Sequence, residues 1–301
     1  MMDASAKSLN DTKQLPKSGL GVFGELLKPR LTLLVLLTTL VGFYMAWHGP
    51  MNYLLMFHAL GGTALLAGGA AALNQLLEQE HDAKMRRTQN RPLPSQRLTP
   101  TPVLIYGGAC SAVGMIWLAM AVNLLTALLG AVTLISYLFI YTPLKRVTWL
   151  NTAIGAVPGA LPPLMGWTAA RNGISAEGWV LFAILCFWQL PHFFAIAWLY
   201  REEYDKAGFV MLPVIDPKGE RTARQVVSHT LGLLPITLSP FLLNMAGPIY
   251  LVGALALGLW FLYSAIMFAR RLDTTSARKL FMVSIIYLPL ILILMVVDKM
   301  K

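Results

Sequence analysis

The chain has 301 residues, of which 56% are hydrophobic and only 13% are charged, and its mean hydropathy is +0.62. This composition excludes an ordinary soluble domain and indicates a membrane protein. In a soluble chain the net charge of +10 would suggest a nucleic-acid partner. In a membrane protein, basic residues gather in loops on one side of the bilayer, so no nucleic-acid partner is expected.

The chain opens with a polar segment, residues 1–20, that lacks the apolar core of a signal peptide. It is predicted to be a disordered cytoplasmic tail, followed by a single polytopic membrane domain over residues 21–301. Nine apolar segments then approach the length of about 20 residues that a helix needs to cross a bilayer. The predicted spans are residues 31–48, 53–77, 102–121, 124–142, 150–169, 178–199, 226–245, 248–269 and 280–297.

The positions of the basic residues support this division. With nine spans, every Lys and Arg except Arg171, Lys299 and Lys301 falls on the same side of the bilayer. The positive-inside rule makes that side the cytoplasm. We therefore expect an integral protein of the bacterial inner membrane, with the N-terminus in the cytoplasm and the C-terminus outside.

Three oxygen-bearing side chains stand four residues apart where the second span ends: Asn74, Glu78 and Asp82. On one helix, this spacing places them in a nearly straight stripe. Mg²⁺ typically takes one or two carboxylates together with phosphate oxygens and water. The stripe therefore predicts a magnesium–diphosphate site at the membrane rim, and the simpler alternative is a solvated polar helix end.

Basic residues accompany the stripe and end the fourth span. A guanidinium binds phosphate oxygens bidentately, so several of these cations together would ring a diphosphate and stabilise it as a leaving group. Singly, each is better explained as an anchor near the membrane surface. The candidates are Lys84, Arg86, Arg87, Arg91, Lys145 and Arg146.

Acidic residues gather in a second loop, after the sixth span, although the positive-inside rule gives them no reason to do so. They would hold a second metal ion, orient the basic groups, or act as counter-ions for neighbouring Lys and Arg. We expect a functional role for Glu203, beside Tyr204, and a counter-ion role for Asp216 and Glu220.

The sixth span contains Trp188, Pro191 and His192. A histidine inside a bilayer segment is costly unless it faces a cavity or a partner, and the proline suits a kink that lines a cavity. Three roles stay open for His192: a ligand of haem iron, a base, or a hydrogen bond to a neighbouring helix.

Residues 74–94 resemble the signature of the protohaem IX farnesyltransferase (haem O synthase) family, a group of UbiA-type intramembrane prenyltransferases. The matches keep their order from residue 28 to about 213, and the remaining spans agree in number and topology only. Glu78 and Glu203 stand where the family commonly has Asp, and both keep the carboxylate. The other similar segments are residues 28–30, 141–146, 188–193 and 204–213.

The resemblance implies an all-α membrane protein with nine transmembrane helices around a central intramembrane cavity. It also implies a reaction in which farnesyl diphosphate ionises with the help of Mg²⁺ and the farnesyl group joins a vinyl group of haem B. Water supplies a hydroxyl, and haem O and diphosphate result. Besides these substrates and the lipid bilayer, it implies a terminal oxidase or a haem A synthase as partner. The implied catalytic residues are Asn74, Glu78, Asp82, Glu203 and Tyr204, the first three as metal ligands, and the implied haem-binding residues are Trp188 and His192.

Two other functions compete with this one. Another enzyme of the same fold would move a prenyl chain onto a quinone or chlorophyll precursor, but the two most specific motifs, residues 85–92 and 188–193, argue against it. A secondary transporter also has many spans and broken helices. Here the charges sit at one rim of the membrane and no internal repeat is visible, which argues against transport.

Overall fold

The computed structural model describes residues 19–300, and within this range the secondary structure is helical apart from one isolated bridge between Ala246 and Lys299. The prediction of an all-α protein is confirmed. The predicted disordered tail lies outside the described residues, except that Gly19 and Leu20 already belong to helix α1 (Gly19–Leu26).

Each predicted span falls on a long helical segment of the described chain. The fourth span is composite, because a stretch of π-helix joins two α-helical pieces. The long segments are α2 (Pro29–Ala46), α3 (Tyr53–Leu77), α5 (Pro100–Ala121), α6 (Leu124–Ile135) with η1 (Ser136–Tyr141) and α7 (Thr142–Leu144), α8 (Asn151–Arg171), α9 (Ala176–Leu199), α12 (Glu220–Leu242), α13 (Pro248–Arg271) and α14 (Thr274–Val297).

Local chemistry fixes where many of these helices begin. The side chains of Asn52, Asn123 and Asp273 accept hydrogen bonds from the first free backbone N–H groups of α3, α6 and α14. Such caps satisfy donors that have no partner inside the helix. Proline stands in the first turn of α2, α5 and α13, where its missing N–H costs nothing.

Seven of the segments in the described chain are both long and apolar enough to cross a membrane. The other two are α8 and α12. Helix α8 carries three prolines and is largely buried among its neighbours, while the first turns of α12 are polar, from Glu220 to Gln225. The chain is therefore an integral membrane protein with at least seven candidate spans, and the count of nine stays a prediction.

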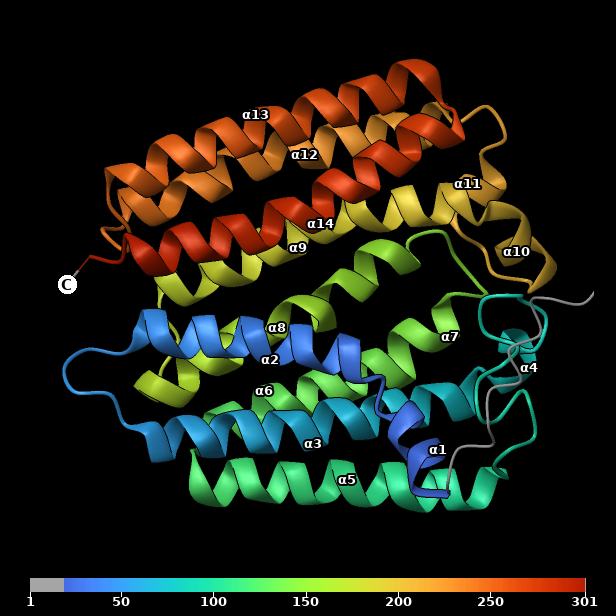
Figure 1. Cartoon of the computed structure of the whole chain (residues 1–301), viewed down its shortest axis with the longest axis horizontal. Coiled ribbons are helices and arrows are strands. Elements are labelled where there is room, and N and C mark those ends of the chain that lie inside the picture. Colours follow the sequence, from blue (N-terminus) through green and yellow to red (C-terminus); the bar gives the residue numbers. More distant parts are fainter. Residues whose placement is uncertain (1–18, 301) are drawn as a thin grey trace, which may run out of the picture.

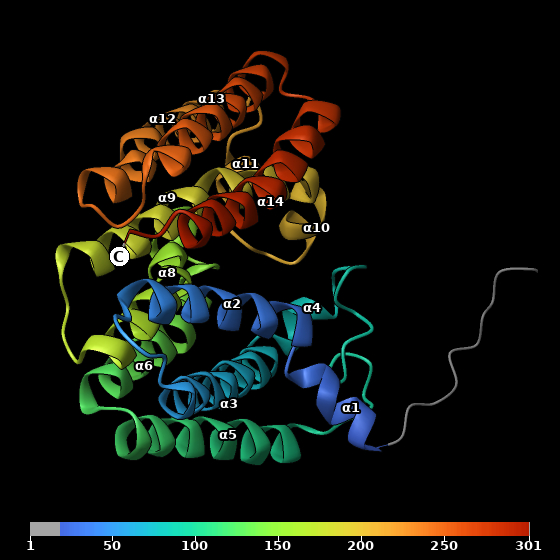
Figure 2. The same ribbon diagram turned by 60° about the vertical axis from the view of Figure 1, so that its left-hand side comes forward.

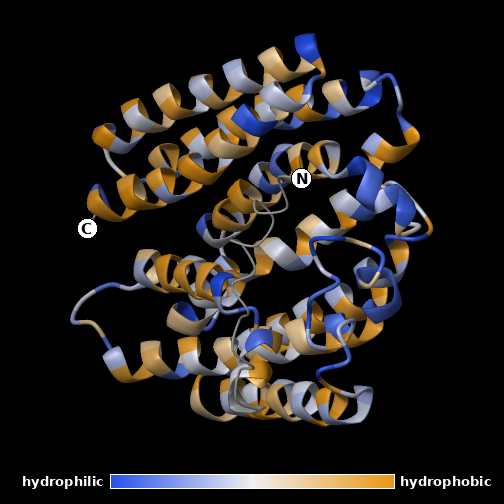
Figure 3. Ribbon diagram, turned by 45° about the vertical axis from the view of Figure 1, so that its right-hand side comes forward, coloured by the Kyte–Doolittle hydropathy of each residue, from blue (hydrophilic) through white to orange (hydrophobic). Residues whose placement is uncertain are grey.

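The surface of the bundle suits a bilayer. Large apolar side chains are exposed along the long helices, as Phe57, Ile105 and Ile293 are on α3, α5 and α14. Polar segments instead gather beyond the helix ends, as the hydropathy colouring shows (Figure 3). An exposed apolar surface of this extent on long helices is expected to face lipid.

The helices form two groups joined by a central pair. Helices α12, α13 and α14 lie together, α2, α3, α5 and α6 form the second group, and α8 and α9 lie between them (Figures 1 and 2). Close crossing of α2 and α8 depends on glycine, because a Cβ at Gly42 would collide with the carbonyl oxygen of Pro163. A Cβ at Gly166 would likewise collide with the carbonyl oxygen of Thr39.

The two ends of the bundle differ. The short helices α1, α4 (Gln79–Asp82), α10 (Arg201–Lys206) and α11 (Leu212–Ile215) lie at one end, which we call the motif end (Figure 1). Residues 47–52, 172–175, 243–247 and 298–300 connect or end helices at the other, which we call the opposite end. The candidate residues of the predicted diphosphate site therefore meet at the motif end.

Candidate active site at the motif end

The stripe of Asn74, Glu78 and Asp82 does not lie on one straight helix. Helix α3 ends at Leu77, and Glu78 has φ −106° and ψ 7° before the single turn of α4 begins. Backbone bonds from Glu78 N to Asn74 O (3.0 Å) and from Asp82 N to Glu78 O (2.8 Å) still bridge the kink. The prediction of a straight stripe is thus wrong, although all three side chains are buried, with 2%, 4% and 1% of their surface exposed.

The amide of Asn74 has a defined orientation. The hydroxyl of Thr142 donates to the carbonyl oxygen of Tyr137 at 2.8 Å, so the Thr142 oxygen accepts from Asn74 Nδ2 at 3.1 Å. Asn74 Oδ1 therefore faces the other way and accepts from Lys28 Nζ at 3.1 Å. The π-helical segment η1 places Thr142 here, and such insertions are frequent at functional sites.

Glu78 forms an ion pair with Lys145, with Nζ 2.7 Å from Oε1. Burial alone would raise the pKa of the Glu78 carboxyl, but Lys145 and Lys28 outweigh it and hold that pKa below its ordinary value. Burial also opposes the charge of Lys145, yet Tyr141 and Glu78 raise its pKa. The pair is therefore ionised at neutral pH. The Tyr141 ring lies 4.5 Å below the ammonium.

Asp82 also forms an ion pair, with its Oδ2 2.5 Å from Nη1 of Arg91. Its backbone oxygen also accepts from the Thr88 hydroxyl at 2.7 Å. Further along the same loop, Arg97 holds the carboxylate of Glu25 through two hydrogen bonds of 3.1 and 2.8 Å. These contacts hold the loop after α4 against α1 and keep Arg91 at the site.

The resulting cluster carries more positive than negative charge. The cations Lys28, Lys145 and Arg91 face two carboxylates and one neutral amide. Burial, and after it the charge of Arg91, lowers the pKa of Lys28 to about 7. An anion bound beside Lys28 would favour its protonated form, so the site is suited to take up a further anion.

A second loop closes over the first. Arg87 donates from its backbone N to Glu203 Oε2 at 3.4 Å and from Nη2 to the Tyr204 hydroxyl at 2.8 Å. Its guanidinium also lies 5.1 Å from the centre of the Tyr200 ring. Glu203 and Tyr204 therefore orient a basic group of the first motif, which is one of the roles predicted for the second acidic cluster.

Three predicted diphosphate-binding residues lie apart from the cluster. Lys84 and Arg86 are exposed. Arg146 donates from Nη2 to the carbonyl oxygen of Leu77 at 3.0 Å, so it caps the end of α3. Asp216, predicted to be a counter-ion, instead accepts from the backbone N–H and hydroxyl of Thr222, in the first turn of α12, at 2.8 and 2.9 Å.

His192 lies between α9 and α14, within the bundle. The Ser284 hydroxyl donates to the carbonyl oxygen of Phe281 at 2.6 Å, so its oxygen accepts from Nδ1 of His192 at 2.7 Å. This assigns the proton to Nδ1 and leaves the lone pair on Nε2 free to bind. The imidazole stacks on Trp188 with ring centres 4.9 Å apart, and Trp188 Nε1 donates to the Ser284 carbonyl at 2.8 Å.

The oxygen donors of the first motif suit a magnesium ion that a phosphate group shares. Asn74 Oδ1 and the carboxylates of Glu78 and Asp82 are hard oxygen ligands of the kind Mg²⁺ takes. Among residues 19–300, no three His, Cys, Asp or Glu side chains converge as a complete protein cage.

Sequence reasoning missed four residues of the site as functional candidates. Lys28 and Tyr141 were noticed only as parts of similar segments, as was Thr142. His81 bridges the two loops, with Nδ1 2.7 Å from the carbonyl oxygen of Ala207 and its ring 5.2 Å from that of Phe209. The signal available for Lys28 was its position directly before a helix that begins with proline.

The chain is similar to known proteins over most of its length. The UbiA prenyltransferase family matches residues 35–287. The protein named protoheme IX farnesyltransferase from Solibacter usitatus is 50% identical over 284 residues, covering 91% of this chain and 97% of its own length. The protein of the same name from Koribacter versatilis is 46% identical over 291 residues, covering 92% and 93%.

A solved structure shares the fold. A UbiA homolog from Archaeoglobus fulgidus, bound to GPP and Mg²⁺, has a TM-score of 0.67 at 17% identity and covers 91% of this chain and 99% of its own. The helical bundle and the buried cluster thus define an integral membrane protein with a prenyltransferase fold. The family match covers most of the sequence, and the chain belongs to the UbiA prenyltransferase family. The resemblance seen in the sequence is confirmed.

Proposed function

We propose that this protein is a magnesium-dependent prenyltransferase that moves the farnesyl group of farnesyl diphosphate onto a vinyl group of haem B. The bond from the allylic carbon to the diphosphate oxygen breaks, and a bond from that carbon to the vinyl group forms. Water adds a hydroxyl, so that haem O and diphosphate are the products. The observation that carries the proposal is the cationic cluster of Lys28, Lys145 and Arg91 around the oxygen donors of α3 and α4.

In this proposal the diphosphate binds the cationic cluster of Lys28, Lys145 and Arg91. Lys145 and Arg91 each pair with a buried carboxylate, and a diphosphate would draw their N–H groups onto its own oxygens. Asn74, Glu78 and Asp82 would then hold Mg²⁺. The metal, when bound, neutralises charge that develops on the leaving diphosphate. Support comes from the Archaeoglobus fulgidus homolog of the same fold, which was solved bound to GPP and Mg²⁺.

Haem B binds deeper in the bundle in this proposal, with the free Nε2 of His192 as the iron ligand. A ligating histidine nearly always donates its other ring N–H to a fixed acceptor, and Ser284 is such an acceptor. Trp188, stacked on the imidazole, would keep its orientation. The relatives named protoheme IX farnesyltransferase support haem as the acceptor.

The overall proposal is tested with the purified full-length protein. Farnesyl diphosphate, haem B and Mg²⁺ are added, and the extracted haems are separated by chromatography. We expect a more hydrophobic haem with the mass of haem O, and diphosphate released in equal amount. Unchanged haem, together with transfer of the farnesyl group to a quinone precursor, would contradict haem as the acceptor.

Arg87→Ala is expected to weaken the use of farnesyl diphosphate by about tenfold to a hundredfold, because a charge-assisted contact is lost and with it one of the contacts between the two loops. Tyr204→Phe, which removes only the hydroxyl that Arg87 binds, is expected to give a smaller loss. The measurement is kcat/KM for farnesyl diphosphate at saturating haem B. A defect confined to haem affinity would show that haem B, and not the diphosphate, binds beside Arg87 at the motif end.

Two adjacent basic residues are expected to behave differently. Lys145→Ala should reduce kcat/KM for farnesyl diphosphate by about tenfold to a hundredfold. Arg146→Ala should leave it within about twofold and lower the free energy of unfolding by about 1 kcal/mol, since it loses one hydrogen bond to the end of α3. Equal losses of kcat/KM in the two variants would show that Arg146 also binds the diphosphate.

The location and topology of the protein also stay predictions. We expect it in the bacterial inner membrane, with the N-terminus in the cytoplasm and the C-terminus outside, and with a single domain over residues 21–301. A central intramembrane cavity and a partnership with a terminal oxidase or a haem A synthase also stay predictions. The positive-inside rule supports the orientation, since the motif end carries nearly all the basic residues.

A further inference from the structure

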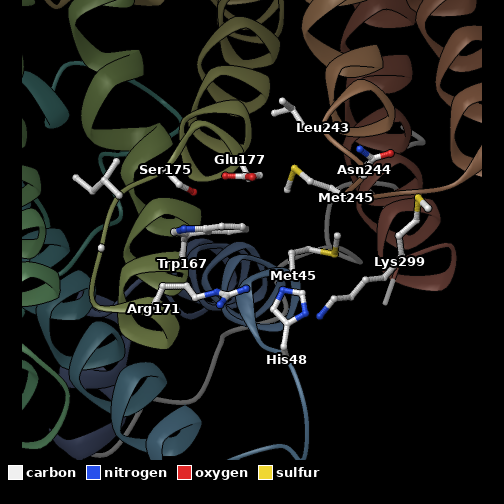
Figure 4. Close-up of a pocket in the computed structure, with 13 residues that line it drawn as sticks. Met45, His48, Trp167, Arg171, Ser175, Glu177, Leu243, Asn244, Met245 and Lys299 are labelled. Carbon is white, nitrogen blue, oxygen red and sulfur yellow. The ribbon is translucent and has the colours of Figure 1, made fainter.

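A cavity of about 470 Å³ opens at the opposite end of the bundle, away from the candidate active site. Its walls come from the ends of α2 and α8, the start of α9, the α12–α13 connection and the residues after α14 (Figure 4). The volume lies in the range of small-molecule sites. Nothing in the proposed reaction uses this cavity.

Apolar side chains line much of the cavity. Met45, Met245 and Trp167 contribute thioether and aromatic surface, and Ile174 and Leu243 add aliphatic surface. The cavity opens where the helices end, which is the level of the lipid headgroups in a bundle that spans a bilayer. An amphiphile would therefore find apolar walls for its upper chains and a polar rim for its head.

The rim concentrates the scarce basic residues of this end. Arg171 ends α8 and Lys299 follows α14, and both line the cavity although they are far apart in the sequence. Among residues 19–300 they are the only Lys or Arg on the side predicted to lie outside. Desolvation and then the charges of Arg171 and Lys299 lower the pKa of His48, which faces the same space.

The side chains of Lys299 and Arg171 differ in their hydrogen bonds. Lys299 donates from Nζ to the carbonyl oxygens of Tyr44 and Trp47, at 2.6 Å each, so it is held in place and supplies positive potential. Arg171 forms no hydrogen bond or ion pair with any residue of the described chain and is exposed. Its guanidinium is thus available to bind an anion bidentately.

A buried donor without a partner points to the same ligand. Trp167 lines the cavity with 5% of its surface exposed, and its Nε1 has no hydrogen-bond partner among residues 19–300. An unsatisfied buried donor costs free energy that an acceptor in the cavity would recover. Figure 4 shows the indole between Glu177 and Arg171. An acceptor bound by Arg171 would therefore lie beside the indole.

We propose that this cavity binds the phosphate headgroup of a phospholipid from the adjacent leaflet. Arg171 binds the phosphate oxygens, the Trp167 N–H donates to the same group, and Lys299 provides the positive surroundings. Glu177, on the other wall, accepts a hydrogen bond from a hydroxyl or ammonium group of the head. The acyl chains leave along the exposed apolar surface of the bundle.

The test uses the full-length protein in detergent, with bound lipids counted by native mass spectrometry during titration. The probes are phosphatidylglycerol and a diacylglycerol with the same chains. Wild-type protein is expected to bind the first at least tenfold more tightly. Arg171→Gln is expected to weaken phosphatidylglycerol binding about tenfold or more, and Trp167→Phe severalfold. Arg278→Gln is the matched control, an exposed arginine at the motif end, and should leave binding unchanged.

Three outcomes overturn the assignment. The first is equal affinity for the two lipids, and the second is equal binding of phosphatidylglycerol by Arg171→Gln and Arg278→Gln. The third is haem B competing for the site with the same dependence on Arg171, which would assign the cavity to porphyrin carboxylates. Haem O formation in Arg171→Gln is measured in parallel, so that a failure of this proposal stays distinct from a failure of the proposed reaction.

Discussion

Asp82→Asn is expected to reduce haem O formation to background while the protein folds and inserts normally. The change keeps the shape of the side chain and removes its charge. Asp82 is buried, supplies the last oxygen donor of the first motif and pairs with Arg91 at 2.5 Å. Metal assistance to a departing charged group is worth several kcal/mol, so the loss of one carboxylate ligand should be large. The measurement is haem O formed over a range of Mg²⁺ concentrations.

A matched control tests whether the charge at this position matters. Glu80→Gln makes the same chemical change two residues away, on an exposed side chain, and should leave turnover near normal. Near-normal turnover in Asp82→Asn itself would remove Asp82 from the site.

The positions of the helices could be predicted because the bilayer imposes a strict rule on length and polarity. The boundaries at Asn123 and Pro248 illustrate this. Asn123 caps α6, and Pro248 begins α13, so single turn residues were sufficient to divide two long apolar stretches. Helices α8 and α12 are less apolar than the other seven, because α8 carries three prolines and α12 begins with a polar segment.

The partners within the site could not be predicted, because they depend on distant parts of the chain. Spacing brought Asn74, Glu78 and Asp82 together, but it did not show the kink at Glu78. Lys28 lies 46 residues before Asn74, and Lys145 lies 67 residues after Glu78. Adjacent residues such as Lys145 and Arg146 also look alike in the sequence. Only the fold shows that the first points into the cluster and the second caps α3.

His192 shows how much the fold adds to an ambiguous residue. The sequence left three roles open, and the partner that narrows them, Ser284, lies 92 residues further along the chain. The hydrogen bond is compatible with simple helix packing and with iron ligation. A histidine that only packs two helices needs no more than the Nδ1 hydrogen bond, whereas an iron ligand also needs an unprotonated Nε2 that is not engaged by another residue.

His192→Ala is expected to abolish haem binding in its native form and to leave binding of farnesyl diphosphate intact. The alanine removes the nitrogen that would ligate the iron, and the optical spectrum with added haem should lose its imidazole-type signature. Ser284→Ala keeps the imidazole but releases its Nδ1–H, and should weaken haem affinity about tenfold to a hundredfold, as loss of a group that orients a metal ligand does.

His58→Ala is the matched control for this experiment. His58 lies on α3 and accepts from Trp117 Nε1 at 2.9 Å, so it is another histidine of a membrane helix with a hydrogen-bonded partner. Its variant should keep the spectrum of the wild-type protein. An unchanged spectrum and haem affinity in His192→Ala would show that this histidine packs α9 against α14. A graded loss of haem affinity, from Ser284→Ala to His192→Ala, together with loss of the imidazole-type spectrum in His192→Ala, is the pattern expected for ligation, because in the proposed site Ser284 acts on the haem through the imidazole.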